Sequence, residues 1–388
     1  SLVVGAYGES EFGGYSGAAY IFSATNDVVN WTHTTKIQAS DAVGDDLFGQ
    51  SVFGLSSTSV LVGASQDNNC VGAAYVFTAA DGGRNWDQST KISASDGSTD
   101  DHFGIFVSGV TATCLVVGAS QDSDLFSYSG SAYIFTTTDD GTWTQSAKIT
   151  PNDGTSSDYF FGTSLSGLSA NSLVAGAIGV GDGYGIYVGA AYIFTATNDG
   201  NWTQSARITA TDAFTGSQFG YSITGDDDSA FFGVSISGLT ANSLVVGASG
   251  EGESGERKGA AYIFTAINDG NWTLSAKITA ANESSSDNFG WSVSGLSSNT
   301  IASGGTSVAV GDPGDGLFAG AAYVFTTKDG KDWSQTAKIT ANDRPDEGTI
   351  TVEFGISLSG LNVTSLVVGA YGDEDLGSIS GAAYIFTA

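Results

Sequence analysis

The stretch Gly259-Ala260-Ala261-Tyr262-Ile263-Phe264 decides the fold, because close copies of it recur along the whole chain. Seven copies of its first four residues occur, one of them with Ser131 in place of the first alanine, at spacings of 55, 58, 59, 70, 61 and 61 residues. Self-similarity at such a period indicates one supersecondary unit that is repeated. The copies begin at Gly17, Gly72, Gly130, Gly189, Gly259, Gly320 and Gly381.

Each repeat aligns as four segments, which read like Phe289–Gly295, Ser243–Ala248, Gly259–Thr265 and Trp272–Ile278. They are short, rich in Val, Ile, Tyr, Phe and Thr, and bounded by Gly, Asn, Asp or Ser, so they predict strands and no helix. The second and third segments are apolar throughout, as in strands covered on both faces, whereas the fourth alternates like a half-exposed outer strand. Four antiparallel strands stacked between neighbours describe a propeller blade.

We therefore expect an all-β fold, a seven-bladed β-propeller of four-stranded antiparallel blades that forms a single domain over residues 1–388. The first blade lacks its first strand and the last blade lacks its fourth. Six blades plus an extra hairpin is the alternative. The expected blades span about 1–46, 47–101, 102–158, 159–217, 218–287, 288–352 and 353–388.

One unit departs from the pattern, because its first segment occurs twice, as Phe219–Gly225 and as Phe232–Gly238. The acidic triplet Asp226, Asp227 and Asp228 separates the two copies. The insertion is either a tolerated duplication or an elaborated loop with a function. The two longest loops, 211–231 and 179–188, are our first candidates for a ligand-binding face.

The charge balance limits the partners that the chain can have. Its 41 acidic and 12 basic residues give a net charge of −29. Such a surface repels nucleic acid and anionic membranes, and it favours cations and basic partners. No run reaches the roughly 18 apolar residues of a membrane helix, so we expect no membrane insertion. A solvated acidic surface without a specific partner is the alternative.

Glycosylation and thiol chemistry give two further expectations. Five Asn-x-Ser/Thr sequons predict glycosylation if the protein is secreted by a eukaryote. The two cysteines, Cys70 and Cys114, fall near opposite ends of a strand in the repeat alignment, so we predict that they are not bonded to each other. The sequon asparagines are Asn30, Asn201, Asn271, Asn282 and Asn362.

The phrases Phe-Gly, Leu-Val-Val-Gly-Ala and Gly-Ala-Ala-Tyr-Ile-Phe closely resemble FG-GAP repeats, the units of the integrin alpha-chain propeller. With Trp-Thr-Gln-Ser-Ala-Lys-Ile, the chain looks most like the subtype found in secreted or surface proteins of microbes and algae. The resemblance implies an extracellular seven-bladed propeller that serves adhesion or ligand binding, without catalysis. The family often carries a calcium loop between its first and second strands, but here that loop reads Gly238-Leu239-Thr240-Ala241-Asn242-Ser243 and lacks the carboxylates.

Acidic residues gather instead in the loop before each Phe-Gly and in the loop between the second and third strands. These loops are candidates for weak Ca²⁺ sites of the kind found in extracellular modules, or they are ordinary solvated turns. The candidate ligands are Asp226, Asp227, Asp228, Asp373 and Asp375.

Six of the seven tryptophans recur at the start of the fourth segment, where they either pack the outer strand or form sugar pockets. The only histidines, His33 and His102, have no metal-ligand spacing, and no nucleophile elbow or phosphate loop occurs. We expect an extracellular, non-catalytic binding or adhesion module that recognises a protein or a glycan. The alternatives are a self-associating building block of a fibre, sheath or appendage, and a carbohydrate-binding or hydrolytic propeller.

Overall fold

A computed structural model describes most of the chain. It divides into two compact units, unit 1 (Ser1–Ala175 and Phe194–Gln204) and unit 2 (Gly176–Ile193 and Ser205–Ala388). The described residues are 1–25, 30–80, 82–138, 141–152, 160–179, 189–197, 199–210, 222–223, 232–233, 236–250, 258–267, 270–281, 287–296, 306–341, 352–362, 365–374 and 380–388.

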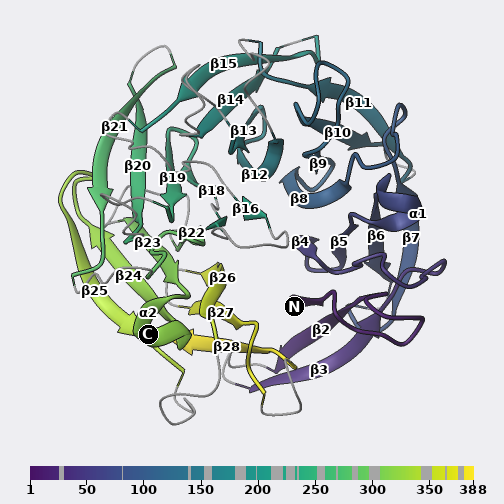
Figure 1. The fold of residues 1–388 in the computed structure, drawn as a ribbon, viewed down its shortest axis with the longest axis horizontal. Helices are drawn as coiled ribbons and strands as arrows, with labels where there is room; N and C mark the ends of the chain where they lie inside the picture. Colours follow the sequence, from purple (N-terminus) through teal and green to yellow (C-terminus); the bar gives the residue numbers. More distant parts are fainter. Residues whose placement is uncertain are drawn as a thin grey trace. The chain divides into compact units, whose positions relative to one another are not determined.

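Antiparallel sheets in simple sequential order follow one another along unit 1 (Figure 1). The sheets are β1-β2-β3, β4-β5-β6-β7 and β8-β9-β10-β11, and the sheet β12-β13-β14-β15 contains the boundary of the unit. The elements are β1 (Leu2–Ala6), β2 (Ala18–Thr25), β3 (Asn30–Ile37), β4 (Ser51–Ser56), β5 (Ser59–Ala64), α1 (Asp67–Cys70), β6 (Ala73–Ala79), β7 (Trp86–Ile92), β8 (Phe103–Thr111), β9 (Cys114–Ala119), β10 (Ser131–Thr137), β11 (Trp143–Ile149), β12 (Phe161–Ser169), β13 (Ser172–Ala177), β14 (Ala190–Ala196) and β15 (Trp202–Ile208).

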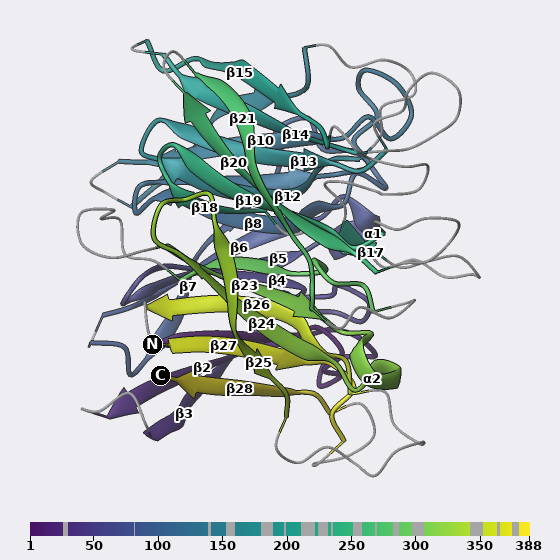
Figure 2. The ribbon, with the colours of Figure 1, turned by 90° about the vertical axis from the view of Figure 1, so that its left-hand side faces the viewer.

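Unit 2 continues the same pattern, and Figure 2 shows its last three strands side by side. Its sheets are β18-β19-β20-β21, β22-β23-β24-β25 and β26-β27-β28, with a two-stranded ladder β16-β17. The elements are β16 (Ser222–Ile223), β17 (Phe232–Gly233), β18 (Ile236–Thr240), β19 (Ser243–Ala248), β20 (Ala260–Ile267), β21 (Asn271–Ile278), β22 (Val293–Gly295), β23 (Thr306–Asp312), α2 (Asp315–Phe318), β24 (Ala321–Thr327), β25 (Trp333–Ile339), β26 (Phe354–Asn362), β27 (Ser365–Ala370) and β28 (Ala382–Thr387).

These sheets confirm the predicted fold class, a β-propeller of seven blades. Within the described residues, five sheets have four strands, and the first and last have three, as predicted. The doubled phrase forms the small β16-β17 ladder instead of a further blade. One expectation was wrong in detail, because two helical turns, α1 and α2, occur where no helix was predicted. Each has four residues, too few to show a 3.6-residue period in the sequence.

Alternate residues of the third strand pack against different sheets. In β6, Ala73, Tyr75 and Phe77 lie in a cluster with the preceding sheet β1-β2-β3, whereas Ala74 and Val76 lie in a cluster with the following sheet β8-β11. This arrangement explains why the third segment is apolar at every position. The sequence Ala-Ala-Tyr-Val-Phe therefore specifies a strand with two buried faces.

The Phe-Gly phrase joins consecutive sheets. Phe103 is fully buried and lies edge-on to Tyr133 and Phe135, with ring centroids 5.5 and 5.9 Å apart. Gly72 forms a parallel bridge with Phe103, and a Cβ added at Gly72 would lie 2.0 Å from the Phe103 carbonyl oxygen. The close approach of two backbones therefore requires glycine at the first position of Gly-Ala-Ala-Tyr.

A bulge recurs in the third–fourth strand pairs β2-β3, β6-β7, β10-β11, β20-β21 and β24-β25. In β10-β11, Ile134 pairs with Ala147 and Phe135 pairs with Gln145, so Ser146 is the extra residue. The Ser146 hydroxyl donates to the Ile134 carbonyl oxygen at 3.1 Å, and it satisfies that part of the ladder. The neighbouring Gln145 Oε1 accepts the backbone N–H of Ser95, at 3.0 Å, from the chain that leaves the preceding sheet.

Candidate binding site at the acidic loops

Antiparallel order divides the loops of each sheet between its two ends. The turns that join strands one to two and three to four lie at one end, called here the turn end. The loops that join strands two to three, and the fourth strand to the next sheet, lie at the other end, called here the acidic end. In unit 1 the acidic end comprises residues 7–17, 38–50, 65–72, 93–102 and 120–130.

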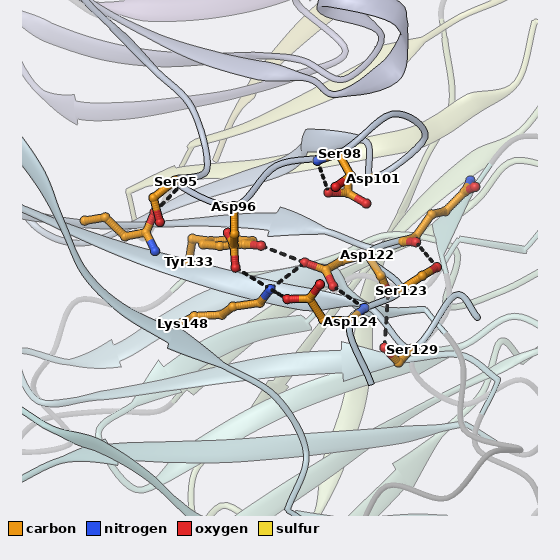
Figure 3. A network of polar contacts seen from close by, with 12 residues as sticks. Ser95, Asp96, Ser98, Asp101, Asp122, Ser123, Asp124, Ser129, Tyr133 and Lys148 are labelled. Atoms are coloured by element: carbon orange, nitrogen blue, oxygen red, sulfur yellow. Dashed lines mark hydrogen bonds and ion pairs between the residues drawn. The ribbon is translucent and has the colours of Figure 1, made fainter. Parts of the chain in front are cut away.

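A lysine from the fourth strand holds the carboxylates of the acidic end in sheet β8-β11 (Figure 3). Lys148 Nζ lies 2.8 Å from Asp122 Oδ2, 2.6 Å from Asp124 Oδ2 and 2.8 Å from Asp96 Oδ2. Asp122 and Asp124 come from the loop between β9 and β10, whereas Asp96 comes from the loop that precedes β8. One ammonium group therefore links two loops.

The tyrosine of Gly-Ala-Ala-Tyr completes this network. Tyr133 Oη donates to Asp122 Oδ2 at 2.6 Å, and Lys148 Nζ lies 5.0 Å from the centre of the Tyr133 ring. Burial, followed by the hydrogen bond to Asp122, raises the pKa of Tyr133. Burial opposes the charge of Lys148, but hydrogen bonds to the three aspartates outweigh it and raise the pKa of Lys148. The tyrosine thus stays neutral and the lysine stays charged at physiological pH.

The same tyrosine, acid and lysine recur in three further sheets, and the last sheet has the tyrosine and the acid. In β4-β7, Lys91 Nζ lies 2.6 Å from Asp41 and 2.8 Å from Asp67, and Tyr75 donates to Asp67 at 2.5 Å. The equivalent groups elsewhere are Tyr20, Glu9 and Lys36; Tyr323, Asp315 and Lys338; and Tyr384 with Asp373. A lysine ammonium lies between loop carboxylates in three of the described sheets, and Lys338 pairs with Asp315 in a fourth, so these loops do not fit a Ca²⁺ site there.

The Ca²⁺ candidates from the sequence are only partly described. Asp373 accepts a hydrogen bond from Tyr384 Oη at 2.6 Å, so it belongs to the recurring network. The turn of the family's calcium loop is closed by hydroxyls, with Thr240 Oγ1 and Ser243 Oγ 2.7 Å apart, and this does not fit calcium either. Asp226, Asp227, Asp228 and Asp375 lie outside the described residues, as do residues 180–188 and most of the loop 211–231.

Sheet β22-β25 carries one carboxylate that the network does not neutralise. Asp312 is the last residue of β23, where the second strands of the other sheets all end in alanine, and it is fully buried. Neither of its oxygens has a hydrogen-bond partner. Burial, followed by the charges of Asp287 and Asp315, raises the pKa of Asp312 to about 9. Its carboxyl group is therefore protonated at neutral pH.

Exposed apolar side chains gather at the acidic end of unit 1. Phe12, Tyr15 and Val43 are 53, 55 and 57% exposed, and Leu125 and Tyr128 are 55 and 47% exposed. The loops of the first three are joined by a hydrogen bond from the Asp45 N–H to the Gly14 carbonyl oxygen at 2.8 Å. In unit 2, Tyr371, 42% exposed, lies in the corresponding loop after β27. These residues have the size and exposure of anchors for a partner.

The described sequon residues lie at the turn end of their sheets. Asn30 and Asn271 begin β3 and β21, Asn362 ends β26, and Asn201 lies in the turn before β15 with an exposed side chain. Asn282 lies outside the described residues. The four described sequon asparagines thus stand at the end of the sheet opposite the acidic loops.

Three of the recurring tryptophans act as packing residues of the fourth strand. Trp143 packs against the core between β4-β7 and β8-β11, and Trp333 packs against the core between β18-β21 and β22-β25. Trp86 is buried and donates from Nε1 to the Gly83 carbonyl oxygen at 3.0 Å. These contacts favour the structural interpretation of the tryptophans over sugar pockets.

One cluster of side chains was not predicted from the sequence. Cys70, Asp100 and His102 come together between the sheets β4-β7 and β8-β11, although 32 residues separate the thiol from the imidazole. Burial, followed by the charge of Asp100, raises the pKa of the Cys70 thiol, and burial lowers the pKa of His102. Cys70 ends α1 and Cys114 begins β9, and both are free thiols. The signal that could have found the cluster is that Cys70 and His102 each replace apolar residues of neighbouring repeats.

The chain is similar in fold to solved structures of other proteins. Of the solved structures, Pseudomonas aeruginosa periplasmic gluconolactonase PpgL is similar over 99% of this chain and 98% of its own, with TM-score 0.51 and 11% identity. Saccharomyces cerevisiae Sqt1 is similar over 87% of this chain and 74% of its own, with TM-score 0.46 and 13% identity. At such identities the likeness concerns the fold alone. No curated protein sequence matched the chain.

The repeats themselves match a family model described as "FG-GAP repeat". Each match runs from the tryptophan of one fourth strand to the phenylalanine of the next third strand. Within the described residues, no helix is long and apolar enough to cross a membrane. The matched segments are 31–77, 86–135, 143–194, 272–325 and 333–386. Because these segments cover well over half of its residues, the chain belongs to the FG-GAP repeat family.

Proposed function

We propose that this protein is an extracellular, non-catalytic adhesion module that binds its ligand at the acidic end. One observation carries the proposal: exposed apolar side chains and acidic loops share one end of the sheets, whereas the described sequons lie at the other end. Glycans on Asn201 and Asn271 would leave the acidic end uncovered. The membership of the FG-GAP family also supports an extracellular binding role.

The chemistry of this end favours a protein ligand with basic and apolar groups. Leu125 and Tyr128 lie within a few residues of Asp124, so an apolar anchor and a carboxylate are presented together. Aromatic anchors contribute much of the energy of protein interfaces, and complementary charge accelerates association. A basic peptide segment with an apolar residue suits this surface better than a flat sugar, since Trp86, Trp143 and Trp333 pack in or against the cores between sheets.

Selection from a random-peptide display library tests the proposal, because it assumes no particular ligand. We expect the selected peptides to be basic and apolar, and to bind Leu125→Ser and Tyr128→Ser at least about tenfold more weakly than the unsubstituted protein. Ile267→Ser is the matched control, because Ile267 is also 54% exposed but lies at the turn end. Peptides that respond to Ile267→Ser and not to Leu125→Ser would place the ligand at the other end.

The alternatives have separate readouts. A building block of a fibre or sheath would sediment as concentration-dependent polymers, whereas the proposed module sediments as one species. Calcium in the loops outside the described residues would make the melting temperature fall when a chelator is added. An unchanged melting temperature would remove calcium from the proposal.

A further inference from the structure

The junctions between the sheets of unit 1 share one backbone contact. The residue before Phe-Gly donates its N–H to the carbonyl oxygen of the residue two positions before Gly-Ala-Ala-Tyr. The distances are 3.0 Å for Leu47 to Tyr15, 2.9 Å for His102 to Cys70 and 2.7 Å for Phe160 to Tyr128. The two side chains of each pair therefore start from adjacent backbone positions.

The chemical character of the pair changes at one junction. Tyr15 with Leu47 is an apolar pair, and Tyr128 stacks on Phe160 with centroids 5.9 Å apart. At the junction between these two, a thiol and an imidazole replace both apolar groups. The whole chain has two cysteines and two histidines, and one of each lies in this pair.

A carboxylate joins the pair. The Sγ atom of Cys70, a ring nitrogen of His102 and a carboxylate oxygen of Asp100 all lie within 4.8 Å of one another. Ligands of a tetrahedral zinc ion lie about 2.0–2.3 Å from the metal, so small side-chain rotations suffice to bring all three atoms onto one ion. Cys70 and His102 are half-buried and Asp100 is exposed, so the cluster is accessible from solvent.

The left-handed backbone at these residues is common to several junctions. Cys70, Asp100 and His102 have φ of 62, 68 and 56°, but Tyr15, Asp45 and Leu47 have 56, 68 and 55° at the equivalent positions. The backbone geometry therefore belongs to the repeat. Only the thiol and the imidazole are particular to this junction, because Asp45 occupies the position equivalent to Asp100.

We propose that Cys70, Asp100 and His102 form a binding site for a divalent transition metal, with Zn²⁺ as the best fit. One sulfur, one nitrogen and one oxygen ligand match a borderline-soft ion and suit neither Ca²⁺ nor Mg²⁺, which take oxygen ligands. On binding, the thiol releases its proton to solvent, and the thiolate, the neutral imidazole and the carboxylate each contribute one electron pair. Three protein ligands leave a fourth position for water or a ligand atom.

The site would link two sheets. Cys70 belongs to α1 in the loop between β5 and β6, whereas Asp100 and His102 precede β8. A bound ion thus connects the acidic ends of β4-β7 and β8-β11, beside the surface proposed for the ligand. The inference does not depend on that function, because it rests on the cluster alone.

Titration with Co²⁺ as a spectroscopic substitute for Zn²⁺ tests the site in the whole chain. We expect one equivalent of Co²⁺ to give a thiolate-to-cobalt charge-transfer band, and one equivalent of Zn²⁺ to abolish it. Cys70→Ser should remove the band, and His102→Asn should weaken Zn²⁺ binding by about 100-fold. Zn²⁺ should also protect Cys70 from alkylation, as read by peptide mass mapping.

The chain supplies its own controls. Cys114→Ser and His33→Asn remove the other cysteine and the other histidine, and both variants should retain the band and the affinity. Metal bound only by scattered surface carboxylates would give no charge-transfer band and would not respond to Cys70→Ser, and that result would overturn the proposal. Because the band is measured on the unsubstituted protein, its absence counts against the site even if a variant fails to fold.

Discussion

The sheets β8-β11 and β22-β25 have the same strand order but treat buried charge differently. In β8-β11 the second strand ends at Ala119, and the nearby Asp122 is satisfied by Tyr133 and Lys148. In β22-β25 the second strand ends at Asp312, which is fully buried without a hydrogen-bond partner. The repeat thus accommodates a buried carboxylate when a lysine and a tyrosine reach it, and it otherwise keeps the carboxyl group protonated.

The largest expected effect comes from placing a buried, unpaired carboxyl group, like that of Asp312, in the sheet β8-β11. Ala119→Asp places a carboxyl group where Ala119 is now fully buried, close to Asp122. We expect the free energy of unfolding to fall by about 4 kcal/mol at pH 8, because the group must be buried as a charge or protonated against solution pH. Urea unfolding measures this change. A loss of unfolding free energy below about 1 kcal/mol would mean that Lys148 and Tyr133 can stabilise a further carboxylate.

The next effect comes from removing the lysine. Lys148→Met keeps an apolar stem over Tyr133 but leaves Asp96, Asp122 and Asp124 without their cation, so we expect a loss of about 3 kcal/mol. Lys338→Met should cost about 1 kcal/mol, because Lys338 is more exposed and its one described ion pair is with Asp315. If the two variants lose the same free energy of unfolding, the contribution of the lysine does not depend on how many carboxylates it contacts.

Removing the buried acid should stabilise the protein. The pKa of Asp312 in the folded state, about 9, lies above its ordinary value of 3.8, so folding takes up a proton and stability falls as pH rises between these values. Asp312→Ala places there the alanine found in the other sheets, and it should add several kcal/mol at pH 8 and little at pH 4, because each pH unit above 3.8 contributes about 1.4 kcal/mol. Unfolding at both pH values measures the difference. A gain that does not depend on pH would contradict the raised pKa.

The smallest effect concerns the tyrosine. Tyr133→Phe removes the hydrogen bond to Asp122 but leaves Lys148 in place, so we expect a loss of about 1–2 kcal/mol. Tyr15→Phe is the control, because Tyr15 is an exposed loop tyrosine. If the two substitutions have the same effect on the melting temperature, the hydroxyl group of Tyr133 does not contribute to stability, and only its ring does.

The sequence predicted the strands and their stacking because those properties repeat with the phrases. Gly72 and Phe103 show why, since each is required by a contact that recurs at several junctions. The lysine network escaped prediction because Lys148 follows Asp124 by 24 residues, and only the pairing of β10 with β11 brings them together. The acid, the tyrosine and the lysine do recur in step along the sequence, and that signal could have been found.

Departures from the repeat were harder to interpret than the repeat itself. Asp312 directly precedes the acidic loop between the second and third strands, but its place at the end of β23 makes it a core residue. His102 looked isolated because metal-ligand spacings are local, whereas its partner Cys70 lies across a junction between sheets. In both cases the informative comparison is with the same position of the neighbouring copies.

Each segment that matches the family model begins one strand before a sheet begins, and this offset affects how such a chain can gain or lose a repeat. A matched segment such as 86–135 contains the fourth strand of one sheet and three strands of the next. Loss or gain of one segment by recombination would therefore join the first three strands of one copy to the fourth strand of another. Such hybrid sheets fold only if the third strand of one copy can pair with the fourth strand of another. The extra Ser or Thr at the same place in that ladder, as at Ser89, Ser146 and Thr336, meets this requirement.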